Sequence, residues 1–172
     1  DCSLALILFG LISGLYQMNL IKLLSVLGAT IILLFLGIKE DLIVLAPKQK
    51  FLGQLFSACI VIFMTDIRID NFNGLLGITE LPYIVSVIFT LFVFILVINA
   101  YNLIDGIDGL AGSLAIIASV SFGIFFLLND QPLLLLVSFA LSGALFGFLR
   151  YNLSDKLKLF MGDSGSLFIG YL

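Results

Sequence analysis

The sequence predicts an all-α protein, a polytopic transmembrane helix bundle of about seven spans with a small hairpin on its outer face. Hydrophobic residues make up 62% of the 172 residues and the mean hydropathy is +1.26, whereas only 11% of residues are charged. In a soluble domain about a quarter of residues are charged. The hydrophobic residues also occur in long unbroken runs, which is typical of membrane spans. The net charge of −3 is small, and no nucleic-acid partner is expected.

Seven hydrophobic segments follow one another along the chain. They cover residues 4–16, 20–38, 51–65, 83–99, 110–128, 133–149 and 164–172. A spanning helix needs about 20 residues, so the first and last segments are short. Pro47 suits the first turn of a longer third helix. The chain begins at Asp1 without Met and ends inside a hydrophobic run, so we expect a single integral-membrane domain over residues 1–172, truncated at both ends.

The loops between the segments alternate between two sides of the membrane. Side one holds residues 39–50, 100–109 and 150–163, and side two holds 17–19, 66–82 and 129–132. Six of the eight basic residues lie on side one, namely Lys39, Lys48, Lys50, Arg150, Lys156 and Lys158, which marks that side as cytoplasmic. On side two, the alternation over residues 67–70 and the Asn73-Gly74 pair predict the hairpin, with an ordered loop as the alternative.

Acidic and amide side chains gather at three places on side one, residues 37–41, 99–112 and 160–166. This side carries six of the eleven acidic residues: Glu40, Asp41, Asp105, Asp108, Asp155 and Asp163. Carboxylates at a membrane boundary are costly unless they are solvated, paired or bound to a cation. Magnesium prefers one or two carboxylates and shares the rest of its shell with water and substrate phosphates. The sequence therefore predicts a shared site for Mg²⁺, with Mn²⁺ as a substitute, and for phosphate.

Simpler explanations exist for single members of these clusters. Asp105 and Asp163 could each cap the helix that follows, and the Asp-Gly pairs could be turns. Capping accounts for one carboxylate per helix. It leaves unexplained the repeated spacing of three that runs from Asn99 through Asn102 and Asp105 to Asp108.

Glycines and lysines on side one are candidate partners for a phosphate. Gly162, Gly165 and Ser166 open the last segment, where the N–H groups of a helix start attract anions. Lys48 and Lys50 precede the third segment. They either anchor that span at the membrane surface or contact a phosphate as point charges.

Three stretches resemble one known family, the polyprenyl-phosphate N-acetylhexosamine-1-phosphate transferases of glycosyltransferase family 4. They read IKEDLIVLAPKQKFLGQ (38–54), NAYNLIDGIDGLAG (99–112) and FMGDSGSLFIG (160–170). Their sequences are more similar to those of the N-acetylglucosamine-1-phosphate transferases than to those of the phospho-N-acetylmuramoyl-pentapeptide transferases. The resemblance implies magnesium-dependent transfer of a phosphosugar from a UDP-sugar to undecaprenyl or another polyprenyl phosphate, with release of UMP. This step initiates the synthesis of cell-envelope glycans.

The resemblance also implies roles for individual residues. It gives catalytic roles to Glu40, Asp41, Asp105 and Asp163, substrate binding to Lys50, Asn99, Asp108 and Asn152, and magnesium binding to Asn102 and Asp163. Lys50 would hold the polyprenyl phosphate and Asp108 would contact the nucleotide sugar. Asp41, with Glu40, would lie near the lipid phosphate and accept its proton.

Two departures from the family limit these expectations. The family usually has two aspartates where this chain has Glu40-Asp41. Its first spans and a later cytoplasmic loop rich in His and Arg have no counterpart here, and this chain contains no histidine. We therefore expect the segment alone to be inactive.

The expected reaction brings two anions together, because a lipid phosphate oxygen attacks the β-phosphorus of the UDP-sugar. Positioning and charge neutralisation by Mg²⁺ and Lys50 would then carry most of the catalysis, and a two-step route through a phospho-aspartate stays open. The expected partners are a UDP-N-acetylhexosamine, polyprenyl phosphate and the bilayer of a bacterial inner membrane, with a homodimer as an option. The alternatives are phospho-N-acetylmuramoyl-pentapeptide transfer and, in a different class, ion-coupled transport. Transporters gather their polar residues near the bilayer midplane instead.

Overall fold

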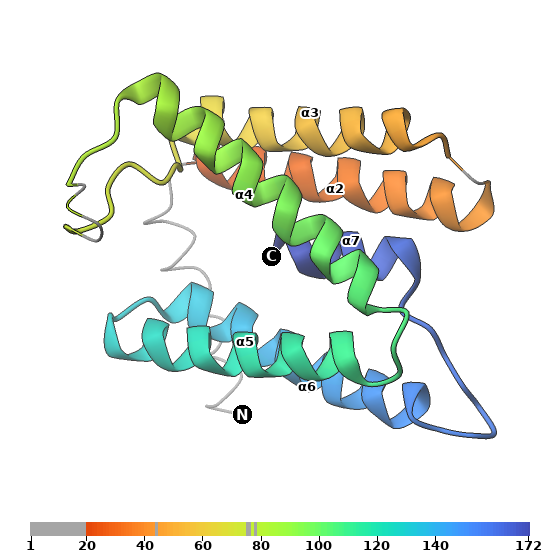
Figure 1. Cartoon of the computed structure of the whole chain (residues 1–172). Coiled ribbons are helices and arrows are strands. Elements are labelled where there is room, and N and C mark those ends of the chain that lie inside the picture. The colour runs from red at the N-terminus through yellow and green to blue at the C-terminus, as the bar shows by residue number, and fades with distance from the viewer. Residues whose placement is uncertain (1–19, 44, 75–76, 78) are drawn as a thin grey trace. The chain divides into compact units, whose positions relative to one another are not determined.

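Six α-helices make up most of the part of the chain that the computed structural model describes, residues 20–43, 45–74, 77 and 79–172 (Figure 1). They are α2 (Leu20–Leu42), α3 (Pro47–Thr65), α4 (Tyr83–Ile104), α5 (Leu110–Leu128), α6 (Pro132–Asn152) and α7 (Gly162–Tyr171). Among these, α4, α5 and α6 are long and apolar enough to cross a membrane. The predicted all-helical membrane fold is confirmed. The expected segment 4–16 lies outside the described residues.

Several helices extend beyond the hydrophobic segments into polar sequence. α2 continues through Glu40 and Asp41, and α4 continues past residue 99, so that Asn102 lies within it. α3 begins at Pro47, whose fixed φ and missing N–H suit the first turn of a helix. A fall in hydropathy does not by itself end a helix, because the hydrogen bonds of a helix join groups of its own backbone. The polar clusters of α2 and α4 therefore lie at the ends of these helices.

The helices belong to two compact units, and each is described by itself. The first, which we call the α7 unit, comprises Ile21–Leu103 and Gly162–Leu172. It contains α3, α7 and nearly all of α2 and of α4. The second, the α5–α6 unit, includes Ile104–Met161. In the α7 unit, Leu33, Ile98 and Leu167 are fully buried against one another. They come from α2, α4 and α7, so these three helices share one apolar core.

Two glycines let the backbone of α7 lie directly against its neighbours. A Cβ placed on Gly37 of α2 would lie 2.4 Å from the Cα of Ser164, and one on Gly170 of α7 would lie 2.8 Å from the Cα of Ile98. Only residues without a side chain allow helix backbones to approach this closely. The close contact at Gly37 brings the first turn of α7 to the polar end of α2.

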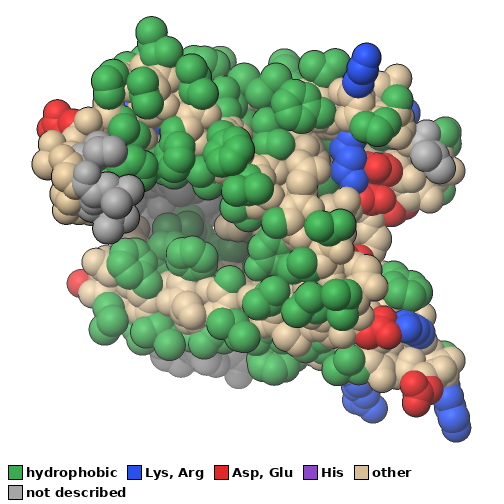
Figure 2. Space-filling model, viewed as in Figure 1, with side chains coloured by type: hydrophobic (Ala, Val, Ile, Leu, Met, Phe, Trp, Pro, Cys, Tyr) green, Lys and Arg blue, Asp and Glu red, His purple; other side chains and the backbone are tan. Residues whose placement is uncertain are grey.

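α5 and α6 pack together along much of their length (Figure 1), and Gly112 and Gly123 of α5 lie against side chains of α6. On α5, Ala111, Ala115, Ser119 and Gly123 are buried, and their spacing of four places them on one helix face. Small side chains of this kind are typical of helix pairs in membranes. Hydrophobic side chains cover most of the visible helix surfaces, while acidic and basic side chains lie together near the end of α2 and the start of α3 (Figure 2).

The loop between α3 and α4 is held by Arg68. Its Nε donates to Asp66 Oδ1 at 2.9 Å and a terminal guanidinium nitrogen donates to Ser86 Oγ at 3.0 Å. A single antiparallel bridge pairs Asn71 with Glu80, outside any strand of the described residues. The expected hairpin is therefore reduced to one bridge, and the alternative of an ordered loop describes this segment better.

Candidate active site

The ammonium of Lys50 lies among three oxygen atoms from three other helices. Lys50 Nζ donates to Asn102 Oδ1 on α4 and to Asp163 Oδ1 on α7, both at 2.9 Å, and lies 3.0 Å from Glu40 Oε2 on α2. The Lys50 and Glu40 side chains are only 14% and 17% exposed, which strengthens the attraction between their charges. Glu40 Oε2 is buried and accepts no hydrogen bond from the described residues. The ion pair with Lys50 partly compensates the burial of this oxygen.

Asn102 links Lys50 to α7. Its Oδ1 accepts from Lys50, and its Nδ2 donates to the Asp163 carboxylate and to Ser166 Oγ. Ser166 is fully buried. The structure thus brings together Asn102 and Asp163, the two predicted metal-binding residues. Ser166 was predicted only as a phosphate contact, and its position one turn after Asp163 on α7 is the signal that identifies it as a member of this cluster.

Asp41 caps α7 from the neighbouring helix α2. Its two carboxylate oxygens accept the backbone N–H groups of Asp163 and Ser164 at 2.8 and 3.1 Å. Burial raises the pKa of Asp41, but the hydrogen bonds from Ser164 and from both backbone groups, together with the Lys50 charge, lower this pKa below its ordinary value. A carboxylate at a helix start is also favourable. At the helix start that was expected to meet a phosphate, the N–H groups of Asp163 and Ser164 are therefore bonded to Asp41 instead.

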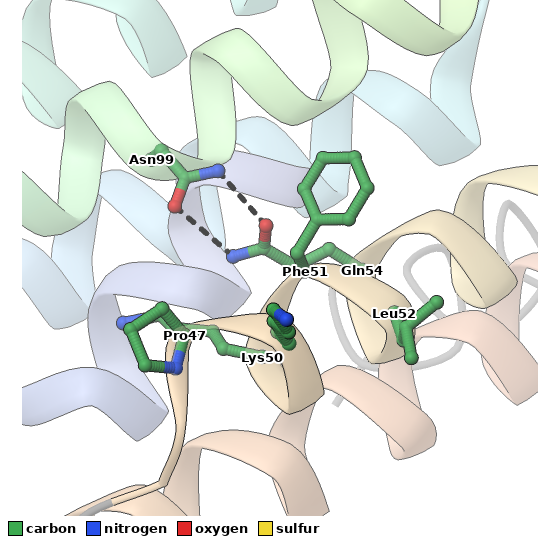
Figure 3. Close-up of a pocket in the computed structure, with 7 residues that line it drawn as sticks. Pro47, Lys50, Phe51, Leu52, Gln54 and Asn99 are labelled. Atoms are coloured by element: carbon green, nitrogen blue, oxygen red, sulfur yellow. Dashed lines mark hydrogen bonds between the residues drawn. The ribbon is translucent and has the colours of Figure 1, made fainter.

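A cavity of about 640 Å³ opens beside Lys50 (Figure 3). It is lined by Pro47, Lys48, Lys50, Phe51, Leu52, Gln54 and Asn99. Its volume lies within the range of about 300–1,000 Å³ that is usual for small-molecule sites. The Lys48 ammonium has no ion pair or hydrogen bond with the described residues, in contrast to that of Lys50. The cavity thus combines apolar walls with one uncommitted positive charge.

Asp108 and Asn152, two predicted substrate-binding residues, lie in the α5–α6 unit. Asp108 Oδ2 pairs with Lys158 Nζ at 2.6 Å. Asn152, 3% exposed, accepts the backbone N–H of Gly109 at 2.6 Å and donates to the carbonyl of Leu159 at 2.9 Å. Asn152 therefore ties the turn before α5 to the loop after α6, and that turn and loop carry Asp108 and Lys158.

Asp105 lies half-buried in the turn that follows α4. The alternative that it caps the next helix is wrong, because Gly109 occupies the N-cap position of α5. The α7 unit brings together the predicted cluster 37–41, residues 162–166 of the third cluster, and Asn102. A single site that also includes Asp105 and Asp108 stays a prediction.

The oxygen atoms around Lys50 fit a magnesium ion. Asn102 Oδ1 and Asp163 Oδ1 already face one cation at equal distances, and Glu40 supplies a buried oxygen without a hydrogen bond. Amide and carboxylate oxygens are the hard donors that Mg²⁺ prefers. The described residues contain no group of three or more Asp, Glu or Cys side chains arranged for a metal. Mg²⁺ in proteins is commonly held by only one or two carboxylates and completes its shell with water and substrate phosphates.

Comparison with known proteins places this chain in a family. The chain is 38% identical over 163 residues to the probable undecaprenyl-phosphate N-acetylglucosaminyl 1-phosphate transferase of Bacillus subtilis. The aligned region covers 94% of this chain and 44% of that protein. The chain is 32% identical over 134 residues to the phospho-N-acetylmuramoyl-pentapeptide-transferase of Listeria monocytogenes, covering 73% and 40%. The chain thus spans less than half the length of these relatives. A family model for glycosyl transferase family 4 matches residues 23–172, so the chain belongs to glycosyl transferase family 4.

Proposed function

We propose that the protein transfers N-acetylglucosamine-1-phosphate from UDP-N-acetylglucosamine to polyprenyl phosphate at the cytoplasmic face of a bacterial membrane, releasing UMP. The observation that carries this proposal is the meeting of Glu40, Lys50, Asn102 and Asp163 in a chain of this family. The Bacillus subtilis relative matches 94% of the chain, against 73% for the Listeria monocytogenes pentapeptide transferase. This difference favours N-acetylglucosamine as the sugar.

Asn102 and Asp163 would hold Mg²⁺, or Mn²⁺ in its place, with Glu40 close by. When bound, the ion would neutralise charge on the diphosphate and stabilise the UMP leaving group. Lys50 contributes a fixed positive charge at the same oxygens. Asp41 holds the first turn of α7, and with it Asp163. Its lowered pKa suits this positioning role better than the acceptance of a proton, which a lipid phosphate with a second pKa of about 6 has little need to lose.

The cavity beside Lys48 would take the end of the lipid that carries the phosphate. Its apolar walls suit an isoprenoid chain, and the uncommitted Lys48 ammonium suits a phosphate. We therefore assign the first contact with the lipid phosphate to Lys48. Lys50, which the family resemblance favoured for this role, already has three oxygen partners.

The proposed reaction exchanges one phosphorus–oxygen bond for another. A lipid phosphate oxygen bonds to the β-phosphorus of the UDP-sugar, while the bond from that phosphorus to the bridging oxygen breaks and UMP leaves with the electron pair. Both reactants are anions, so the work of the protein is to align them and to offset their repulsion. Lys48 and Lys50 supply positive charge on the lipid side, and Asp108 is proposed to contact the nucleotide sugar.

The full-length protein, purified with undecaprenyl phosphate and Mg²⁺, tests the proposal when it is given either of two donors. We expect UMP and an undecaprenyl-diphosphate-linked sugar from UDP-N-acetylglucosamine, at least about tenfold faster than from UDP-N-acetylmuramoyl-pentapeptide. Chromatography measures UMP and mass spectrometry identifies the lipid product. Turnover of the pentapeptide donor alone would establish the alternative transferase, which the Listeria similarity supports. No UMP from either donor, together with solute movement across vesicles, would establish transport.

A further inference from the structure

Gln54 and Asn99 form a reciprocal pair of side-chain amides between α3 and α4 (Figure 3). Asn99 Nδ2 donates to Gln54 Oε1 at 2.8 Å, and Gln54 Nε2 donates to Asn99 Oδ1 at 3.3 Å. Asn99 Nδ2 also donates to the carbonyl of Ile95 at 2.8 Å. Both hydrogens of the Asn99 amide are therefore used within the protein, which leaves it poorly placed to donate to a substrate.

Glu40, Lys50, Asn102 and Asp163 together form what we call the Lys50 cluster. The amide pair lies one helical turn from this cluster on both α3 and α4. Gln54 follows Lys50 by four residues on α3, and Asn99 precedes Asn102 by three residues on α4. Residues at these spacings share one face of a helix. The Gln54–Asn99 and Lys50–Asn102 contacts are therefore neighbouring links between the same two helices.

Gln54 is buried, with 1% of its surface exposed. A buried amide that loses its hydrogen-bond partner keeps the full free-energy cost of its desolvation. Sliding or rotation of α3 against α4 would break this pair and is therefore unfavourable. The same slide or rotation would separate the ammonium of Lys50 from the amide of Asn102. The amide pair thus opposes displacement of the charged cluster.

We propose that Gln54 and Asn99 are positioning residues, which set the register of α3 on α4 and thereby hold Lys50 and Asn102 in the geometry of the active site. The inference rests on the proposed function, because it gives those two residues their catalytic purpose. It assigns a role to Gln54, which the sequence motifs left without one. It also moves Asn99 from direct substrate binding to the support of Asn102.

Exchange of the two amides tests this role, because glutamine is one methylene longer than asparagine. Gln54→Asn leaves a gap and Asn99→Gln a clash, whereas the double variant keeps the summed length of the pair. In the full-length protein we expect each single variant to lower kcat at least about tenfold and to weaken Mn²⁺ binding about tenfold or more. At saturating Mn²⁺ we expect little change in KM for the UDP-sugar. We expect the double variant to return within about threefold of the wild-type values.

Three measurements separate positioning from general stability: UMP release, Mn²⁺ titration by electron paramagnetic resonance, and thermal denaturation. Ser57→Ala on α3 is the matched control, since Ser57 is fully buried and donates to the carbonyl of Gly53 in its own helix. We expect it to lower the melting temperature without changing Mn²⁺ affinity.

Distinct results would overturn the proposal. Loss of activity in Asn99→Gln that the added Gln54→Asn change does not restore would mean that Asn99 contacts substrate directly. Unchanged Mn²⁺ affinity and kcat in both single variants would reduce the pair to a structural contact. If the wild-type protein neither bound Mn²⁺ nor released UMP, the proposed function would fail, and the positioning role would fail with it. A non-additive change in melting temperature would then show only that the two amides pair.

Discussion

Asp163 meets two partners through a single oxygen atom. Its Oδ1 accepts from Lys50 and from Asn102, while its backbone N–H is held by Asp41. The side chain is about a quarter exposed, so it can reach water and ligand as well. The alternative that Asp163 merely caps α7 is wrong, because Asp41 supplies that cap. The position of Asp163 is thus fixed from three sides while its carboxylate faces the candidate cation site.

Replacement of Asp163 by asparagine tests the importance of its charge. The amide is similar in shape but neutral, so it binds a divalent cation more weakly and no longer pairs with Lys50. We expect UMP release to fall at least about a hundredfold in the full-length protein. Asp155→Asn is the matched control, because Asp155 is an exposed carboxylate in the loop after α6, and its activity should stay close to that of the wild type. Normal turnover by Asp163→Asn would remove Asp163 from the proposed metal site.

α7 is held in place by contacts with α2 and α4. These contacts are the buried packing of Leu167 against Leu33 and Ile98, the Asp41 cap and the close approach at Gly37. The position of the Asp163 carboxylate on α7 is therefore set by the packing of this helix against α2 and α4.

A methyl group at position 37 should disturb that packing. In Gly37→Ala the new Cβ meets the backbone of Ser164, so α2 and α7 have to separate, and we expect a loss of about 1–3 kcal/mol in the free energy of unfolding. Activity should fall as well, because Asp163 moves with α7. Gly28→Ala on the same helix is the control, since a Cβ there meets no atom of the described residues within 4 Å. Equal melting temperatures for the two variants would contradict the close packing of α2 and α7.

Hydrophobic patterning predicted the apolar parts of the helices well and their polar ends poorly. The predicted segment 110–128 coincides with α5 (Leu110–Leu128), because turn residues flank it on both sides. α4 was predicted to end near residue 99, since hydropathy falls at the first asparagine, although the helix continues to Ile104. The motifs identified Asn102 and Asp163 as partners. They gave no indication of Asp41 as the α7 cap or of Gln54 as the partner of Asn99, because such contacts join helices that are distant in sequence.

The hydrophobic surface of the helices indicates a membrane setting for the chain. Large apolar side chains such as Phe35, Phe92 and Phe125 are more than half exposed, which is unfavourable in water but not among lipid tails. The polar ends of α2 and α4 and the start of α7 carry the candidate site. The distribution of lysine and arginine predicts that these ends face the cytoplasm.

Cysteine labelling tests this orientation in intact cells. Single cysteines at Asp70 and Asp155, two exposed positions in the loops after α3 and α6, would be introduced after removal of the native cysteines, including Cys2 and Cys59. A membrane-impermeant maleimide should label position 70 in intact cells and position 155 only after permeabilisation, because the two loops are predicted to lie on opposite sides. The reverse pattern would place the candidate site outside the cytoplasm and would contradict the proposed use of a UDP-sugar.

The charged members of the Lys50 cluster and the adjacent Asp41 together set the local electrostatic field at this end of the α7 unit. Glu40, Asp41 and Asp163 carry three negative charges against the single positive charge of Lys50, a formal sum of 1 − 3 = −2. The field of these four side chains repels a diphosphate, and a divalent cation cancels it. If the protein works as proposed, uptake of the cation and uptake of the anionic donor are thermodynamically linked, each raising the affinity for the other by the same factor.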